Sequence, residues 1–272
     1  MRILAINDVS CVGKCSLTAA LPIISACGIE CNILPTAILS THTGGFEGYT
    51  FRDCTEDFPA ILAHWKSLNL QFDFVVSGYL GSIHQIQMVL QIKKDFLKPD
   101  GIFVVDPVMG DSGKLYDGFT DAYVKKMREL CAEADYILPN ATEACYLTDL
   151  SYPLNNQTAL IAFERLKDIC KTPIVTGVTN EKNISVYFPD TNGNVCTYAH
   201  ENIDGMFPGA GDVFTSAFVG ALARGKDKKQ AVLLATDFAN ACIRRSTKEV
   251  TDKRYGLPFE KEIFPFLQKL NG

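Results

Sequence analysis

The chain has 272 residues, of which 47% are hydrophobic and 21% charged, and its formal net charge is −5. This is an ordinary globular composition, and an acidic balance without a long basic run argues against a nucleic-acid-binding surface. No apolar run reaches the roughly 18 residues of a membrane span and the first residues lack a signal-peptide pattern. We therefore expect a cytoplasmic protein that keeps its ten cysteines reduced and binds neither membranes nor nucleic acids.

Short apolar runs alternate with longer amphipathic stretches from the first residue onward. The predicted strands cover residues 2–6, 30–38, 72–78, 101–107, 134–140 and 172–178. The predicted helices cover residues 14–27, 56–69, 82–97, 119–132, 141–148 and 157–170. Because the strands lack polar alternation and each is followed by a helix, we predict a parallel sheet with helices on both faces.

Two later extended runs, at 184–189 and 195–200, are joined by the sequence DTNGN. Asn-Gly between extended runs is a strong hairpin signal, so we predict an antiparallel pair at the edge of the sheet. The chain closes with three predicted helices, over residues 210–224, 227–246 and 259–270. The whole pattern predicts one α/β domain over residues 1–272, with a mostly parallel central sheet and an antiparallel edge hairpin.

In such sheets, ligands bind outside the carboxyl ends of the strands. Polar loops follow the predicted strands at seven places and hold much of the chain's glycine. They are Asn7-Asp8, STHTGG (40–45), SGYLGS (77–82), DPVMGD (106–111), PNATEA (139–144), TGVTN (176–180) and PGAGD (208–212). We expect them to converge on one edge and form the functional site.

The loop PGAGD directly precedes a long apolar helix. Gly209, Ala210 and Gly211 let a ligand approach the backbone, and the start of a helix offers unpaired N–H groups and the positive end of its dipole. Asp212 could cap this helix. Alternatively, it could accept the proton of a hydroxyl group that attacks a phosphoryl group held by the same N–H groups. From this stretch alone, both interpretations stay open.

Two other loops carry groups that suit a magnesium–nucleotide complex. Asp106 ends a predicted strand, and Asn140 and Glu143 begin a predicted helix. Mg²⁺ keeps much of its water, so Asp106 and Glu143 could hold it with Asn140 orienting the shell, while Thr176 could bond a nucleotide phosphate. The structural alternative is an N-cap at Asn140 with Glu143 as its capping-box partner. The chain lacks a Walker A motif and a G-x-G-x-x-G after its first strand, which disfavours a P-loop kinase and a dinucleotide-dependent dehydrogenase.

Taken together, these motifs are specific. PGAGDVFTSAFVGAL resembles the signature of the ribokinase-like superfamily, whose members phosphorylate alcohols with the Asp of a GxGD motif. SGYLGS, DPVMGD and PN-x-x-E resemble the vitamin-kinase branch, and STHTG with SGYLGS resembles the pyridoxal kinases. The resemblance runs from Met1 to about residue 248. It implies a ribokinase-like three-layer sandwich and ATP-dependent phosphorylation of the 5′-hydroxymethyl group of a B6 vitamer (pyridoxal, pyridoxamine or pyridoxine) in vitamin B6 salvage.

The resemblance also implies which residues act on the phosphoryl group. Asp212 matches the catalytic base. The other matches are the anion hole (Gly209, Ala210 and Gly211), the Mg²⁺ and phosphate network (Asp106, Asn140 and Glu143) and a phosphate contact (Thr176). Residues 111–118 match a lid over ATP. ATP with Mg²⁺ is the implied cosubstrate, relatives can be activated by a monovalent cation such as K⁺, and relatives are commonly homodimers.

On the vitamer side, Thr43 matches a threonine that bonds the pyridoxal ring, and Tyr79 matches an aromatic residue that packs over it. His42 could contact substrate hydroxyl groups or bond the backbone of neighbouring loops, and both alternatives stay open. Met206 and Phe207 could form a wall beside adenine or pack at the start of the helix; we favour the wall.

The chain departs from the pyridoxal kinase pattern at Asp8. These enzymes usually begin SIQSHVVYGHVG, with a serine near the ring nitrogen, whereas this chain has AINDVSCVGKCS. Because an aspartate favours a protonated pyridinium, we expect Asp8 to bias the site toward a protonated ring or an aminomethyl substrate such as pyridoxamine.

Two alternative functions remain. The ND-x-S start resembles the hydroxymethylpyrimidine kinases of thiamin synthesis, although STHTG argues against them. A non-catalytic nucleotide or vitamin sensor is the other alternative, and the intact GAG turn with Asp212 argues against it.

Overall fold

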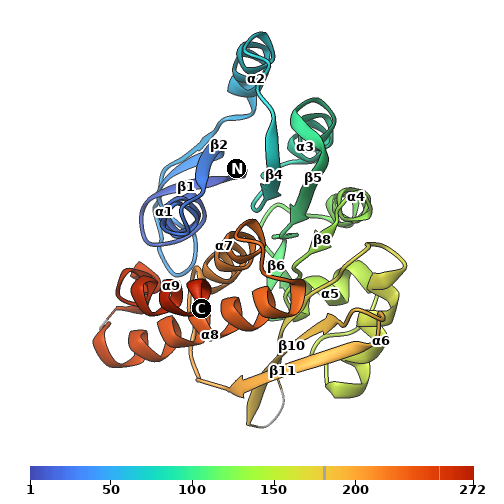
Figure 1. Ribbon diagram of the computed structural model, residues 1–272, viewed down its shortest axis with the longest axis vertical. Coiled ribbons are helices and arrows are strands. Elements are labelled where there is room, and N and C mark those ends of the chain that lie inside the picture. Colours follow the sequence, from blue (N-terminus) through green and yellow to red (C-terminus); the bar gives the residue numbers. More distant parts are fainter. Residues whose placement is uncertain (180–181, 251) are drawn as a thin grey trace.

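A six-stranded sheet, in the order β3-β2-β1-β4-β5-β8, forms the centre of the computed structural model, which describes residues 1–179, 182–250 and 252–272 (Figure 1). The parallel strands are β1 (Arg2–Val12), β2 (Glu30–Thr41), β4 (Phe72–Ser77), β5 (Leu97–Val105) and β8 (Tyr136–Ile137). At the outer edge, β3 (Phe51–Asp53) pairs antiparallel with β2. The predicted, mostly parallel sheet is confirmed.

An antiparallel sheet extends this arrangement. It contains β9 (Val175–Thr179), β10 (Asn183–Pro189) and β11 (Val195–Glu201). Parallel bridges from Ile137 to Pro173 and from Asn140 to Thr176 connect β8 and its following loop to the chain around the start of β9. The predicted antiparallel edge hairpin is therefore confirmed as β10 and β11.

Helices cover the sheet on both faces. One face packs against α2 (Phe58–Ser67), α3 (Ile83–Phe96), α4 (Asp121–Ala132), α5 (Ala141–Thr148) and α6 (Asn156–Lys167). The other packs against α1 (Leu17–Ala26), α7 (Ala210–Ala223), α8 (Lys228–Glu249) and α9 (Ile263–Asn271) (Figure 1). Along β1, Leu4 and Ile6 join the first hydrophobic cluster and Ile3 joins the second. Burial on both faces explains the absence of polar alternation and confirms the three-layer sandwich.

The structure corrects the first predicted strand and helix. β1 continues to Val12, so Asn7 and Asp8 lie inside the strand and not in a loop after residue 6. The pairing of β1 with β2 shifts by one residue between Asn7 and Val9, an irregularity of the kind that re-aims side chains near functional sites. The first helix begins at Leu17 instead of residue 14.

Three very short strands were not predicted. One is β3, and the other two, β6 (Gly110–Asp111) and β7 (Lys114–Leu115), form a hairpin within the loop that we matched to a lid. Its turn residues, Ser112 and Gly113, have φ of 51° and 81°, and positive φ at both central positions is the geometry of a tight hairpin turn. Strands of two or three residues are too short to show a period-two pattern in the sequence.

In the described part of the chain, no helix is both long and apolar enough to span a membrane. Three 3₁₀ turns, Thr55–Asp57, Lys253–Tyr255 and Phe259–Lys261, complete the described elements.

Candidate active site

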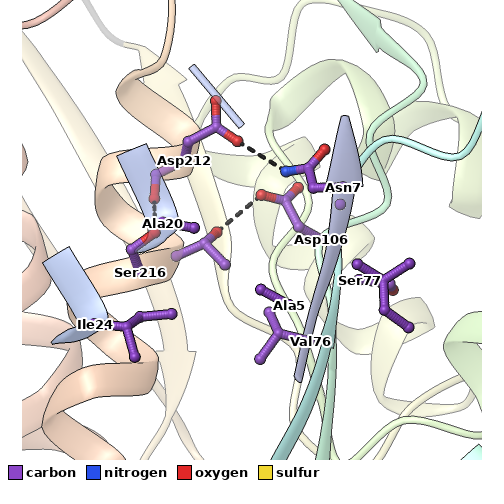
Figure 2. Close-up of a pocket in the computed structure, with 12 residues that line it drawn as sticks. Ala5, Asn7, Ala20, Ile24, Val76, Ser77, Asp106, Asp212 and Ser216 are labelled. Atoms are coloured by element: carbon purple, nitrogen blue, oxygen red, sulfur yellow. Dashed lines mark hydrogen bonds between the residues drawn. The ribbon is translucent and has the colours of Figure 1, made fainter. Parts of the chain in front are cut away.

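Asp212 lies in the first turn of α7, after the glycine-rich turn. The helix is N-capped by Gly209, whose φ is 82°, and a Cβ there would lie 2.3 Å from the carbonyl oxygen of Lys14. A Cβ on Gly211 would have no described neighbour within 4 Å, so the turn is open on that side. Among the described residues, no side chain forms a capping hydrogen bond to α7, so the interpretation of Asp212 as its cap is wrong. Instead, Asn7 Nδ2 donates to Asp212 Oδ1 at 3.2 Å (Figure 2).

The environment of Asp212 makes its carboxylate more basic than an exposed aspartate. Burial raises its pKa from 3.8 to about 6, opposed by the backbone N–H of Ser16 and the side chain of Asn7, while the charge of Asp8 raises the pKa further. Such a group is largely ionised at neutral pH yet accepts a proton readily. These are the properties of a general base.

Asp8 interacts electrostatically with Asp212 and with two predicted vitamer contacts, His42 and Tyr79. It is buried, and its two carboxylate oxygens accept hydrogen bonds from the hydroxyl groups of Ser10 at 3.1 Å and Ser16 at 2.5 Å. Burial raises the pKa of Asp8, and these hydrogen bonds lower it. The pKa of Tyr79 rises to about 12, mainly because the side chain is buried and next because of the Asp8 charge. Asp8 therefore lies within electrostatic range of both Asp212 and Tyr79.

Asn7 connects these groups through its side-chain amide. Besides donating to Asp212, it accepts hydrogen bonds at Oδ1 from the backbone N–H groups of Asp8 at 3.0 Å and Tyr79 at 2.8 Å. A Cβ on Gly78 would lie 2.3 Å from Asn7 Nδ2, so the glycine of SGYLGS leaves space for this amide. Asn7 thus fixes β1, the loop after β4 and α7 relative to one another.

Asp106 approaches Asp212 from the end of β5. The Thr215 hydroxyl group, on α7, donates to Asp106 Oδ2 at 2.8 Å. Burial and the neighbouring Asp212 charge raise the pKa of Asp106 to about 7. Figure 2 shows both aspartates beside a cavity of about 20 Å³ that Asn7 and Ser216 also line. A volume of this size holds roughly one water molecule.

Asn140 and Glu143 form the capping box of α5, which confirms the structural alternative. Asn140 Oδ1 accepts from the Glu143 N–H at 2.9 Å, and Glu143 Oε2 accepts from the Asn140 N–H at 2.8 Å. Glu143 Oε1 accepts from the Met109 N–H at 3.2 Å, and Asn140 Nδ2 donates to the Gly110 carbonyl at 2.9 Å. The box therefore holds the loop after β5. Burial, and then Asp106, raise the pKa of Glu143 well above its usual value.

The predicted vitamer contacts lie on two loops. His42 is buried, with Nε2 bonded to the Arg254 carbonyl at 2.6 Å and Nδ1 accepting from the Gly44 N–H at 3.0 Å. The backbone-bonding role of His42 is thus confirmed, and only its ring carbons remain for a substrate. Thr43, the next residue, is exposed. The Tyr79 ring lies 5.9 Å from that of Phe119, between ring centroids.

The remaining predicted nucleotide contacts lie just before α7 and in β9. Residues 176–179 of the predicted loop 176–180 belong to β9, and residue 180 lies outside the described residues. Thr176 is half-buried and its N–H donates to the Pro139 carbonyl at 2.9 Å, which places it beside the capping box. Met206 is 67% exposed, while Phe207 packs against the second hydrophobic cluster. Their contacts with ATP stay predictions.

Several residues in this network were not predicted to have a role. They are Ser10, Ser16, Thr215 and the segment 252–256. Asn7 was expected at the site, but its contact with Asp212 was not predicted. Thr215 could have been found, because it follows Asp212 by three positions and therefore shares its helix face. The segment 252–256 carries no motif, and its partners are far away in the sequence.

Comparisons with known proteins find relatives over most of the chain. Residues 17–256 match the family model described as phosphomethylpyrimidine kinase. The chain is similar to a Bacteroides thetaiotaomicron protein assigned as a phosphomethylpyrimidine kinase and crystallised with pyridoxal. The two are 37% identical, the similarity covers 100% of this chain and 96% of that one, and the TM-score is 0.91.

Two pyridoxal kinases are also similar. The structure of the enzyme from Lactobacillus plantarum is 32% identical, with 98% of this chain and 96% of that chain covered and a TM-score of 0.91. The enzyme from Dictyostelium discoideum is 29% identical over 201 residues, which are 71% of this chain and 62% of that protein. The chain therefore spans less than two thirds of the Dictyostelium relative.

Proposed function

We propose that this chain, which belongs to the phosphomethylpyrimidine kinase family, transfers the γ-phosphoryl group of ATP to the 5′-hydroxymethyl group of a B6 vitamer. The observation that carries the proposal is the Asp212 carboxylate, with its raised pKa, beside an open glycine-rich turn at the start of α7. The pyridoxal in the Bacteroides relative and the pyridoxal kinases among the relatives support a B6 vitamer as the acceptor.

In this proposal, Asp212 takes the proton of the vitamer hydroxyl group as the oxygen attacks the phosphoryl group. The backbone N–H groups of Gly209 and Gly211 and the positive end of the α7 dipole stabilise the charge on the transferred group. The Ala210 N–H donates to the Phe207 carbonyl at 3.1 Å, so Ala210 contributes by shaping the turn. Thr43 and Tyr79 hold the ring, with His42 shaping the loop. The nucleotide lies along Asn140, Thr176, Met206 and Phe207.

A magnesium ion bound with ATP would supply positive charge that offsets the negative charge of the phosphates. Among the described residues, no three His, Cys, Asp or Glu side chains gather into a metal site. Mg²⁺ in nucleotide sites needs only one or two carboxylates besides water and phosphate, so Asp106 and Glu143 fit this ion. Because both Glu143 oxygens already accept hydrogen bonds from N–H groups, Asp106 is the stronger candidate ligand.

Loop carbonyls would hold a K⁺ ion. We also propose that the protein has a single domain and acts as a homodimer in the cytoplasm.

The family description favours one alternative, the phosphorylation of hydroxymethylpyrimidine. Both functions can be tested by incubating the protein with Mg·ATP and one acceptor at a time, and measuring ADP release. We expect turnover with pyridoxal, pyridoxamine or pyridoxine. Turnover with hydroxymethylpyrimidine alone would replace the proposed function by the alternative, and ATP binding without turnover on any acceptor would indicate a sensor.

The Asp212→Asn variant tests the role of the base within the same assay. It keeps the shape of the side chain and removes its ability to accept the proton, so we expect kcat to fall about 10²-fold or more. The affinity for ATP, measured by calorimetry, should stay close to that of the wild type. A wild-type kcat in this variant would show that Asp212 is not the base.

A further inference from the structure

The segment Asp252–Gly256, which we call the clasp, packs against the loop that carries the predicted vitamer contacts. His42 Nδ1 accepts the Gly44 N–H, so Nε2 carries the ring proton and donates it to the Arg254 carbonyl at 2.6 Å. These two residues are 212 positions apart in the chain. The Arg254 guanidinium lies over the ring of Phe46, with Cζ 5.1 Å from the ring centroid. The centroids of the Phe46 and Tyr255 rings are 5.3 Å apart.

The same segment reaches the glycine-rich turn through the backbone of Lys14. The Lys14 N–H donates to the Tyr255 carbonyl at 3.2 Å, and Lys14 and Gly256 form a parallel bridge. The Lys14 carbonyl also lies close to Gly209. A Cβ at position 209 would be 2.3 Å from this oxygen, so only a glycine fits there. The Lys253 ammonium also lies 4.7 Å from the ring centroid of Phe207.

We propose that the clasp is a positioning element for phosphoryl transfer. It fixes the loop 42–46, which carries Thr43, relative to the turn 207–211, which leads into Asp212. This inference rests on the proposed function. In-line transfer needs the attacking hydroxyl group and the phosphoryl group aligned closely, and an error of about 1 Å can cost about 10²-fold in rate. The clasp touches both supports, so it sets their separation.

Gly256 is the position at which the clasp can be loosened selectively. Its φ is 82°, and a Cβ there would lie 2.9 Å from the Lys14 nitrogen and 3.0 Å from the Lys14 carbonyl oxygen. Gly193, in the hairpin between β10 and β11, has φ of 83° and no described atom within 4 Å of such a Cβ. Gly256→Ala and Gly193→Ala therefore bring a similar backbone strain, and only the first displaces Lys14.

We expect Gly256→Ala to lower kcat about tenfold or more, while KM for ATP and for the vitamer each change less than threefold. The reason is that each support keeps its own ligand contacts and only their alignment is lost. Gly193→Ala should leave kcat unchanged. A role in folding alone would lower the melting temperature without changing kcat per folded molecule. Equal kcat values in the two variants would therefore overturn the proposal.

Substitutions of His42 test the clasp from the other side. The longer amide side chain in His42→Gln can still donate an N–H toward the Arg254 carbonyl, whereas the shorter one in His42→Asn keeps only the acceptor for the Gly44 N–H. We expect kcat to fall more in His42→Asn than in His42→Gln. The reverse order would contradict the proposal.

Hydrogen exchange separates failure of the clasp from failure of the proposed function. We expect Gly256→Ala to speed amide exchange at least tenfold in residues 42–46 and 207–211, relative to Gly193→Ala. This measurement needs no turnover, so it remains valid if the wild type phosphorylates no vitamer and the proposed function fails. Unchanged exchange in both segments, or faster exchange with unchanged kcat in an active enzyme, would overturn the positioning role.

Discussion

The charge of Asp8 raises the pKa of Asp212, and this coupling predicts how activity depends on pH. The pKa of Asp212 is raised to about 6, so below that pH the base is protonated and cannot accept the vitamer's proton. We expect kcat/KM to fall about tenfold per pH unit below about pH 6 and to level off above it. Because the Asp8 charge raises the pKa of Asp212, Asp8→Asn should move this acidic limb to lower pH.

The measurement is a pair of kcat/KM profiles for the wild type and Asp8→Asn. The ionisations of the vitamer and ATP are common to both profiles, so the difference between them isolates the protein's own groups. A limb that stays in place or moves to higher pH would contradict the coupling.

Asp8 also predicts which vitamer the enzyme prefers. Its carboxylate is held by Ser10 and Ser16, and it stands where pyridoxal kinases have a serine. A hydrogen bond to a charged group contributes about 1.5–3 kcal/mol, so Asp8→Ser should lower kcat/KM for pyridoxamine about tenfold or more relative to pyridoxal. Assays of kcat/KM for each of the three vitamers test this prediction. An unchanged order of preference would show that Asp8 does not select the vitamer.

The sequence predicted those residues of the site whose chemistry is recognisable in a short motif. Asp212, Asp106, Asn140 and Glu143 were found because each directly follows a strand or begins a helix. Asn7 was noticed only as a polar residue, since its function depends on a contact with Asp212, 205 positions away. No local pattern encodes such a contact.

At the level of elements, two neighbouring helices begin with the same capping box but differ in what the cap touches. Asn155 caps α6 with Thr158 as its partner, and Asn140 caps α5 with Glu143. Only Asn140 also donates to the Gly110 carbonyl, at the base of the β6–β7 hairpin. One box therefore stabilises a helix, and the other also holds a loop of the active site.

This difference predicts a matched pair of variants. Loss of an N-cap costs about 1 kcal/mol, so Asn155→Ala should lower the free energy of unfolding by about that amount with no change in kinetics. Asn140→Ala should lower it further, because the Gly110 carbonyl loses its partner, and should raise KM for ATP. Urea unfolding and steady-state kinetics measure both effects. Equal KM values would show that the capping box does not support the nucleotide site.

The long elements were predictable and the short ones were not. The amphipathic pattern of α4 continues over its 12 residues, and the apolar ends of β4 and β5 are typical of buried strands. The polar start of β5, residues 97–100, was not predicted to be a strand. The extension of β1 beyond Ile6 carries polar residues that face the site, so its sequence resembles a loop. Function thus interrupts the pattern on which strand prediction depends.

At the scale of the whole molecule, the two ends of the chain pack together. The C-terminal helix α9 lies beside α1 and α8, and Figure 1 shows its red ribbon next to the blue of α1. The second hydrophobic cluster draws on α1, α7, α8 and α9 and supports the helix that carries Asp212. The helix predicted at 259–270 was placed a few residues early, because a 3₁₀ turn at Phe259–Lys261 precedes α9.

Two phenylalanines of α9 test whether this packing stabilises the whole fold. Phe266 is buried in the second cluster and stacks on Phe238 with ring centroids 4.6 Å apart, whereas Phe264 is 70% exposed. We expect Phe266→Ala to lower the free energy of unfolding by about 3–5 kcal/mol, and Phe264→Ala to change it by less than about 0.5 kcal/mol. Urea unfolding followed by circular dichroism measures both. If α9 did not contribute to the shared core, the two variants would have similar free energies of unfolding. Kinase activity would then survive at urea concentrations that unfold α9. We expect instead that activity and helix content are lost together, because α7 shares its core with α9.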